Sequence, residues 1–167
     1  MSSGVAGKHE RALRALQTQF KDRTTRKTYL ALCRGRPDFS EKRVENYLGR
    51  SPANRKKMCV TDPAHGRVAI SNFRVAERFD RAFRAEIRIE TGRTHQIRVH
   101  AAHLGHGILG DEVYGKGGDP LARAPRQMLH AWRLEIRHPM TGALLKLEAP
   151  PPPDFLEVEN RLRAEGA

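Results

Sequence analysis

Regular alternation of apolar and polar residues predicts β-strands in several parts of the chain. The clearest example is residues 83–89 (FRAEIRI), where apolar side chains alternate with Arg84, Glu86 and Arg88, as in a strand with one buried face. Residues 67–79 show a similar pattern with one break, so the two segments are expected to form a hairpin across Glu77–Ala82. Further strands are predicted at residues 27–33, 128–137 and 143–149, the last two joined by a turn at 138–142. Residues 44–48 are predicted to form a short strand or a turn, and residues 51–57 a basic loop.

Apolar residues at helical spacing predict a helix at residues 8–21, where Leu13, Leu16 and Phe20 share one side. Helices are also predicted at residues 94–104 and 155–163, and the glycine-rich residues 105–118 are typical of a loop with unusual backbone angles. No repeat or linker divides the sequence. Residues 1–167 are therefore interpreted as one α+β domain, with a mixed, largely antiparallel sheet and flanking helices.

The composition indicates a folded and strongly basic protein. The 167 residues include 31 Lys and Arg against 19 Asp and Glu, which gives a formal net charge of +12. Residues 1–60 hold 15 of the basic residues and only five acidic ones, a concentration that favours an RNA or DNA partner. No apolar run reaches the roughly 20 residues of a membrane helix, no secretory leader is recognisable, and two cysteines form neither a disulfide framework nor a zinc pattern. The sequence therefore predicts a cytoplasmic protein without a membrane partner.

Residues 90–115 hold the highest density of chemically active side chains. Arg93, Arg98, Asp111, Tyr114 and four histidines surround a predicted junction of strand and helix. A glycine followed by polar residues at a helix start presents free backbone N–H groups to an anion. The histidines lack the compact ligand set and the supporting cysteines of a zinc site, so hydrogen-bonded histidines are the simpler interpretation and no metal is predicted.

Four motifs stand in order along the chain: RKTYLALCRGRP (26–37), SPANRKKMCV (51–60), TGRTHQIRVH followed by GHGILGDEVYG (91–115), and LHAWRLEIRHPMTGALLKLEAPPPPDF (129–155). In register, they resemble the RluA family of RNA pseudouridine synthases. The resemblance spans about residues 2–156, in the order in which that family has the motifs. It implies the fold of the pseudouridine synthase catalytic domain and the isomerisation of uridine to pseudouridine in RNA, without a cofactor.

The resemblance also implies roles for individual residues. Tyr29 matches the family's pocket tyrosine, which contacts the target base, and Arg93 matches the basic residue that pairs with the catalytic aspartate. Such a pair keeps a carboxylate ionised through an opposite charge at close range. Ile97 falls where the family has an apolar pocket residue, and Gln96 beside it is assigned to the same substrate pocket.

A base inside an RNA stack must be flipped out before an enzyme can reach it, which requires a pocket and positive charge along the RNA backbone. Both ribosomal RNA and transfer RNA are substrates of the family, and the sequence does not choose between them or indicate an oligomeric state. The residues expected to contact RNA are Arg26, Lys27, Arg55, Lys56, Lys57 and Arg98.

The family's catalytic aspartate stands in a His-Arg-Leu-Asp segment, followed after two residues by Thr-Ser-Gly. If residues 2–4 correspond to that Thr-Ser-Gly, the aspartate falls two places before Met1, and the seven aspartates present lie in other contexts. Asp111 matches a structural position of the family. We therefore expect a catalytic domain without its N-terminal portion, inactive alone, with an exposed sheet edge and an exposed apolar face. A non-catalytic RNA-binding module and a basic domain that binds a protein are the alternatives.

Overall fold

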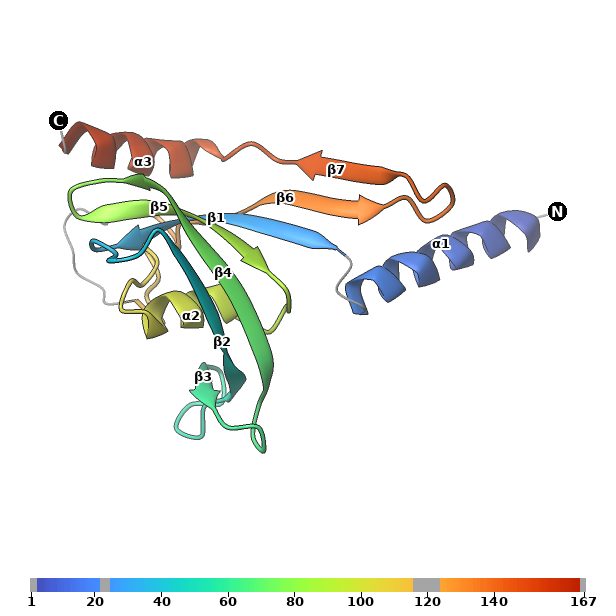
Figure 1. The fold of residues 1–167 in the computed structure, drawn as a ribbon, viewed down its shortest axis with the longest axis horizontal. Coiled ribbons are helices and arrows are strands. Elements are labelled where there is room, and N and C mark those ends of the chain that lie inside the picture. Colours follow the sequence, from blue (N-terminus) through green and yellow to red (C-terminus); the bar gives the residue numbers. More distant parts are fainter. Residues whose placement is uncertain (1–2, 22–24, 116–123, 166–167) are drawn as a thin grey trace.

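The computed structural model of the protein describes residues 3–21, 25–115 and 124–165. Figure 1 shows a sheet with helices on either side of it. The elements follow in the order α1 (Ser3–Lys21), β1 (Arg26–Arg34), β2 (Glu41–Arg50), β3 (Met58–Thr61), β4 (Arg67–Arg78), β5 (Ala82–Ile89), α2 (Gln96–His103), β6 (Leu129–Arg137), β7 (Leu144–Glu148) and α3 (Pro153–Glu165).

The sheet has the strand order β3-β2-β4-β5-β1-β6-β7, and every neighbouring pair is antiparallel. The predicted hairpins are confirmed, because β4 pairs with β5 and β6 pairs with β7. The first strand in the chain, β1, lies between β5 and β6 near the middle of the sheet. The α+β class with a largely antiparallel sheet is therefore confirmed.

The period of two residues in β1 assigns its side chains to two faces of the sheet. Tyr29 lies opposite Ile87, which lies opposite Phe73, so these three residues share one face. Ser71, two residues before Phe73, shares that face and contacts α2 through His100. Helix α2 therefore covers the face that carries Tyr29 (Figure 1).

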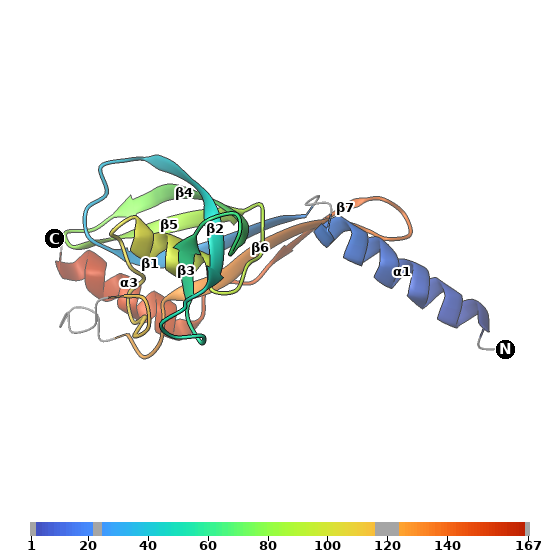
Figure 2. The same ribbon diagram turned by 90° about the horizontal axis from the view of Figure 1, so that it is seen from below.

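The opposite face is covered by α3, whose Phe155, Val158 and Leu162 belong to the same apolar core as Leu30 and Leu32 of β1. Helix α1 extends away from the body of the sheet (Figure 2). It is joined to the end of β6 by Gln19, whose amide donates to the carbonyl oxygen of Arg137 at 2.8 Å and accepts its N–H at 2.7 Å. Within the described residues, no helix combines the length and apolar character that crossing a membrane requires.

Some predicted boundaries were wrong. The segment 44–48 was predicted as a short strand or turn, but β2 runs over ten residues. Only Val44, Leu48 and Gly49 of this strand are buried, so its polar positions hid the pattern. Helix α1 begins at Ser3, five residues earlier than predicted, whereas α2 begins only at Gln96, because His95 before it has a left-handed backbone with φ of 54°.

The predicted glycine-rich loop is confirmed as far as Gly115, and residues 116–118 lie outside the described residues. Gly110 shows why glycine is needed there. It has φ of 79°, and a Cβ atom at this position would lie 2.0 Å from the carbonyl oxygen of Arg126. The backbone of the loop can approach the segment before β6 this closely only without a side chain.

Candidate active site

Tyr29 lies at a cavity of about 340 Å³ between β1, β6 and β7. The lining is largely apolar, and Tyr29 is half-buried in it. Burial raises the pKa of the Tyr29 phenol above its ordinary value of 10, because the charged phenolate loses water. The phenol is therefore protonated at neutral pH. The lining residues are Lys27, Thr28, Tyr29, Ala131, Trp132, Arg133, Leu134, Leu147, Glu148 and Ala149.

The segment that carries Arg93 adjoins the same end of β1. Ile89, the last residue of β5, lies opposite Lys27 of β1, and the chain then turns through residues 90–95 towards α2. A Cβ atom at Gly92 would lie 3.7 Å from Nζ of Lys27, so the ammonium group of Lys27 sits beside this turn. Lys27 and the turn with Arg93 are thus brought together, although they are more than 60 residues apart in sequence. Tyr29 follows Lys27 by two residues in β1 and shares its face of the sheet.

Arg93 is half-buried, and its side chain is directed by the protein backbone. Its Nε–H donates to the carbonyl oxygen of Val68 in β4 at 2.8 Å. Its backbone N–H donates to Oε1 of Gln96 at 3.0 Å. These two bonds fix both the main chain and the guanidinium of Arg93 relative to the sheet.

Gln96 is the centre of a buried network of hydrogen bonds, and only 3% of its surface is exposed. Besides the bond from Arg93, its Oε1 accepts the hydroxyl of Thr91 at 2.7 Å. Its Nε2 donates to the carbonyl oxygen of Ile70 and to Oγ of Ser71, each at 2.9 Å. The side chain of Gln96 therefore holds the turn against β4.

Ile97, the other predicted pocket residue, is 5% exposed and belongs to the main apolar core. The structure thus places both predicted pocket residues of α2 inside the fold. Their side chains face the sheet, on the side of the sheet that Tyr29 occupies. Neither Gln96 nor Ile97 presents a side chain to the solvent side of α2.

Arg98, predicted to contact RNA, is engaged inside the protein. Its Nε and Nη2 donate to the two carboxylate oxygens of Asp111 at 2.9 and 3.0 Å, and the two side chains are 13% and 0% exposed. The hydrogen bonds that Arg98 donates to Asp111 raise the pKa of Arg98. Burial disfavours ionisation of Asp111, but the bonds from Arg98 and from the N–H groups of Tyr114 and Val113 lower its pKa overall. The guanidinium of Arg98 is thereby committed to a buried ion pair.

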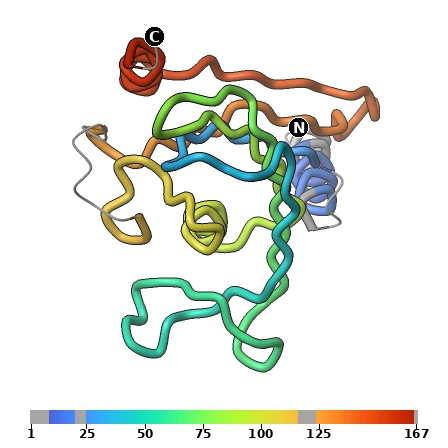
Figure 3. Tube along the Cα trace, turned by 60° about the vertical axis from the view of Figure 1, so that its left-hand side comes forward, coloured from blue at the N-terminus to red at the C-terminus, as the bar shows by residue number. Residues whose placement is uncertain are grey.

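The other predicted RNA contacts lie at the surface. Arg26, Arg55 and Lys56 are exposed, and Lys57 is half-buried. Residues 51–57 close the β2–β3 hairpin, with the N–H of Ser51 donating to the carbonyl oxygen of Lys57 at 2.9 Å. Figure 3 shows this hairpin reaching past α2 on the side away from α3. These residues, 51–57, are called the basic loop below, and they extend the α2 side of the molecule.

His100 is a buried histidine held by hydrogen bonds, as the simpler interpretation of the histidines predicts. Its Nδ1 lies 2.8 Å from Oγ of Ser71, and its Nε2 lies 2.8 Å from Oδ1 of Asn46. Burial lowers the pKa of His100 to about 4, so the ring is neutral at physiological pH. No group of three or more His, Cys, Asp or Glu side chains that could hold a metal ion occurs among the described residues.

The described aspartates are mostly engaged elsewhere. Asp62 accepts bonds from His65, Asp80 pairs with Arg36, and Asp154 pairs with Arg126, as Asp111 does with Arg98. Asp38 is exposed on the segment that leads into β2. Asp22 and Asp119 lie outside the described residues.

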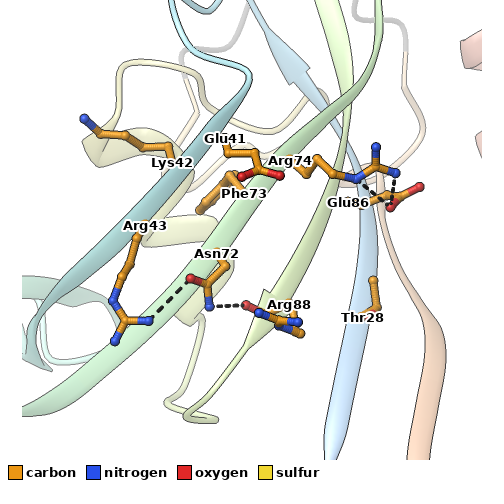
Figure 4. A pocket seen from close by; sticks show the side chains of 9 residues that line it. All are labelled: Thr28, Glu41, Lys42, Arg43, Asn72, Phe73, Arg74, Glu86 and Arg88. Atoms are coloured by element: carbon orange, nitrogen blue, oxygen red, sulfur yellow. Dashed lines mark hydrogen bonds and ion pairs between the residues drawn. The ribbon is translucent and has the colours of Figure 1, made fainter.

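The face of the sheet opposite α2 also carries a polar cavity, of about 390 Å³ (Figure 4). Two of its arginines are paired with acidic or amide groups: Arg74 donates to Glu86, and Arg43 donates to Asn72 and to Glu90. These cross-strand pairs offset part of the positive charge on this face.

The sequence motifs assign roles to Tyr29 and Arg93 but not to the residues around them. Ser71 and Asn46 lie outside the motifs, Thr91 lies within one without an assigned role, and their contacts depend on how α2 crosses the sheet. Tyr114 also lies within a motif without an assigned role. Its hydroxyl lies 2.7 Å from Nδ1 of His95 and accepts the N–H of Met58 at 2.9 Å.

Comparisons with known proteins identify close relatives. Residues 3–103 match the sequence model of a family described as RNA pseudouridylate synthase. The chain is 39% identical over 154 residues to the ribosomal large subunit pseudouridine synthase D of Nitrosomonas europaea, covering 89% of this chain and 44% of that protein. It is 42% identical over 133 residues to the protein of the same name from Pseudomonas aeruginosa, covering 73% and 41%. The chain thus spans about half the length of the curated relatives it matches.

Solved structures agree with these sequence matches. The human RNA pseudouridylate synthase domain containing 1 superposes with a TM-score of 0.72 at 30% identity, covering 86% of this chain and 62% of that one. The human RNA pseudouridylate synthase domain containing 4 superposes with a TM-score of 0.75 at 25% identity, covering 90% and 67%. The sheet and helices described above therefore follow the arrangement of these two proteins.

Proposed function

Since the chain belongs to the RNA pseudouridylate synthase family, we propose that it forms the base-binding part of an RluA-type active site, which isomerises uridine to pseudouridine in RNA. Ribosomal RNA is the proposed substrate, because the relatives from Nitrosomonas europaea and Pseudomonas aeruginosa are named for the large ribosomal subunit. Residues 1–167 are proposed to be one partial catalytic domain of a cytoplasmic protein. No cofactor takes part in the reaction.

The observation that carries this proposal is that the Arg93 turn lies beside Lys27, two residues along β1 from Tyr29. Tyr29 lies at a largely apolar cavity, and the register places Lys27 directly opposite Ile89, at the start of that turn. An apolar cavity with a few fixed polar groups is the usual form of a site for a small planar ligand such as a nucleobase. Uracil is the ligand proposed for it.

In the reaction, the bond between N1 of uracil and the ribose breaks, the base turns, and C5 forms a new bond to the same ribose carbon. C5 then loses its proton and N1 takes one up, so the product is an isomer of the substrate. Tyr29 would contact the turning base, and its protonated hydroxyl would act as a hydrogen-bonding group at the site where C5 loses its proton. Arg93 would pair with the catalytic carboxylate and keep it ionised and oriented.

The catalytic carboxylate is the part that these residues do not supply. The family's His-Arg-Leu-Asp segment does not occur in the 167-residue sequence. Most of the described aspartates have cationic partners away from Tyr29. A neutral phenol is a poor nucleophile towards ribose, so Tyr29 cannot replace an aspartate. We therefore propose that the 167-residue chain binds RNA without turning it over.

Tritium release from RNA that carries 5-tritiated uridine tests this proposal. The 167-residue chain should bind the RNA and release no tritium. A fusion that adds the family's His-Arg-Leu-Asp segment at the N-terminus should release tritium. Turnover by the 167-residue chain would refute the assignment of the missing carboxylate.

The fusion also tests the two assigned side chains. Tyr29→Phe and Arg93→Ala in the fusion should each reduce tritium release at least 100-fold, the scale expected when a group acting in the transition state is removed. Tyr47→Phe is the matched control, because Tyr47 is 37% exposed on β2. If the fusion with Tyr29 and Arg93 intact binds RNA but releases no tritium, the proposed site is contradicted.

A further inference from the structure

Tyr114 links two segments that are far apart in sequence, namely the start of α2 and the base of the basic loop. Its hydroxyl oxygen accepts the backbone N–H of Met58, the first residue of β3, at 2.9 Å. The same hydroxyl lies 2.7 Å from Nδ1 of His95, the residue before α2. A single side-chain atom therefore connects the basic loop to the turn that carries Arg93.

The hydroxyl of Tyr114 can bind both neighbours at once. The backbone N–H of Met58 can only donate, so the Tyr114 oxygen accepts from it. The Tyr114 proton is then free to be donated to Nδ1 of a neutral His95. Burial and the nearby charge of Arg98 lower the pKa of His95, which favours this neutral acceptor.

Apolar packing also holds the ring of Tyr114 in place. Tyr114 and Met58 both pack against a small apolar cluster of Leu48, Ala69 and Val99, which is separate from the main core. This cluster joins β2, β4 and α2, so it lies where the β2–β3 hairpin leaves the body of the protein. Tyr114 closes the cluster on the side of the basic loop.

The ion pair beneath Tyr114 fixes its backbone. Oδ1 of Asp111 accepts the N–H of Tyr114 at 3.1 Å and that of Val113 at 3.0 Å. The guanidinium of Arg98, held by the same carboxylate, lies 5.0 Å from the centre of the Tyr114 ring. Arg98 thus supports Tyr114 from below while it is itself removed from solvent.

The basic loop is internally ordered but depends on its base for its position. The N–H of Lys57 donates to the carbonyl oxygen of Asn54 at 2.9 Å, and the N–H of Lys56 donates to Oδ1 of Asn54 at 3.1 Å. These bonds preserve the shape of the loop if it moves as a unit. Its direction relative to α2 is set at Met58, where Tyr114 binds.

We propose that Tyr114 is a positioning residue for RNA binding, which holds Arg55 and Lys56 at a fixed place relative to Arg93. The inference rests on the proposed function, because it assumes that these cations contact RNA phosphates. Ordering a mobile loop on binding costs free energy. Charges that are held in place before binding therefore contribute more affinity than mobile ones. Tyr114 itself does not touch RNA in this scheme.

The test compares Tyr114→Phe, which removes only the hydroxyl, with Tyr47→Phe, which removes an exposed hydroxyl from β2 of the same hairpin. Amide hydrogen exchange at Met58 should accelerate in Tyr114→Phe and stay unchanged in Tyr47→Phe. Affinity for a fluorescently labelled, uridine-containing RNA stem–loop should fall about fivefold in Tyr114→Phe only, which corresponds to the loss of one hydrogen bond of about 1 kcal/mol. Thermal unfolding of both variants shows that the sheet remains folded.

A double-mutant cycle separates positioning from a general loss of stability. Lys56→Gln should weaken RNA binding severalfold in the unaltered protein, but hardly at all in Tyr114→Phe, because the loop is then no longer held in place. Additive effects of the two changes would overturn the inference. Equal RNA binding by the unaltered protein and Tyr114→Phe would overturn it as well, with the proposed function intact. Absence of salt-sensitive RNA binding by the unaltered protein would overturn both.

Discussion

The side-chain oxygen of Gln96 accepts the backbone N–H of Arg93 at 3.0 Å, so the first residue of α2 fixes the main chain of the proposed catalytic arginine. The same amide group binds Thr91 and the backbone of β4. A residue that the family resemblance placed beside the substrate thus acts from within the fold. Its hydrogen bond fixes the backbone position from which the side chain of Arg93 extends.

Replacing Gln96 by Met keeps the volume of the side chain and removes its amide. We expect the free energy of unfolding to fall by about 2–4 kcal/mol, because the N–H of Arg93 and the hydroxyl of Thr91 lose a buried partner. Urea denaturation measures the change. Gln17→Met, at an exposed position of α1, is the control and should stay within about 0.5 kcal/mol. A similar small effect at Gln96 would contradict the role of the network.

Asp111→Asn should be among the most destabilising single changes in the protein. It leaves the guanidinium of Arg98 without a counter-charge in a site that is 13% exposed, and removal of one partner from a buried pair costs about 3–5 kcal/mol. Urea denaturation again gives the value. Asp80→Asn breaks an exposed pair with Arg36, so this control should cost less than about 1 kcal/mol. Equal costs at the two sites would show that the Arg98 pair is not buried in solution.

Stability should decrease in mild acid because of His100. Its pKa is about 4 in the folded protein against an ordinary value of 6.5, so between these values the unfolded chain binds a proton that the folded protein excludes. The free energy of unfolding therefore falls as the pH drops from 6.5 to 4, by up to about 1.4 kcal/mol per pH unit. Denaturation curves across this range should be less pH-dependent for His100→Gln. His9→Gln, on the exposed side of α1, should leave the pH dependence unchanged.

Replacing Arg55, Lys56 and Lys57 together by Gln should reduce the salt dependence of RNA binding. Each phosphate contact releases about one counterion, so the slope of log affinity against log salt should fall by about 2–3. Fluorescence anisotropy at several salt concentrations measures the slope. Arg161→Gln on α3, on the far side of the sheet from α2, is the control. An unchanged slope for the triple variant would remove the basic loop from the RNA interface.

The sequence predicted those elements in which burial alternates regularly. In β5, Phe83, Ala85, Ile87 and Ile89 are all buried and the residues between them are not, so the period of two was plain. In β2 the pattern failed, because this strand lies towards the edge of the sheet and most of its side chains meet solvent. Alternation of apolar and polar residues reveals a strand only where one face of it is buried, and few residues of β2 are buried.

The contacts of the site were less predictable than its residues. The motifs drew attention to Tyr29 and Arg93, but nothing local indicates that Arg98 turns inwards to Asp111. That direction follows from the left-handed backbone of His95, which sets where α2 starts and which side chains face the sheet. The bond between Tyr114 and Met58 joins residues 56 positions apart, beyond the reach of any local pattern.

The central place of β1 has a consequence for how the chain acquires its structure. Leu30, Ala31, Leu32 and Cys33 are at most 3% exposed, yet this strand leaves the ribosome long before either of its neighbours. Its partners β5 and β6 are completed only at Ile89 and Arg137. Pairings between such distant segments form slowly, because a long loop must close first. This buried strand therefore stays unpaired during synthesis, and chaperones that shield extended apolar segments would act at this stage.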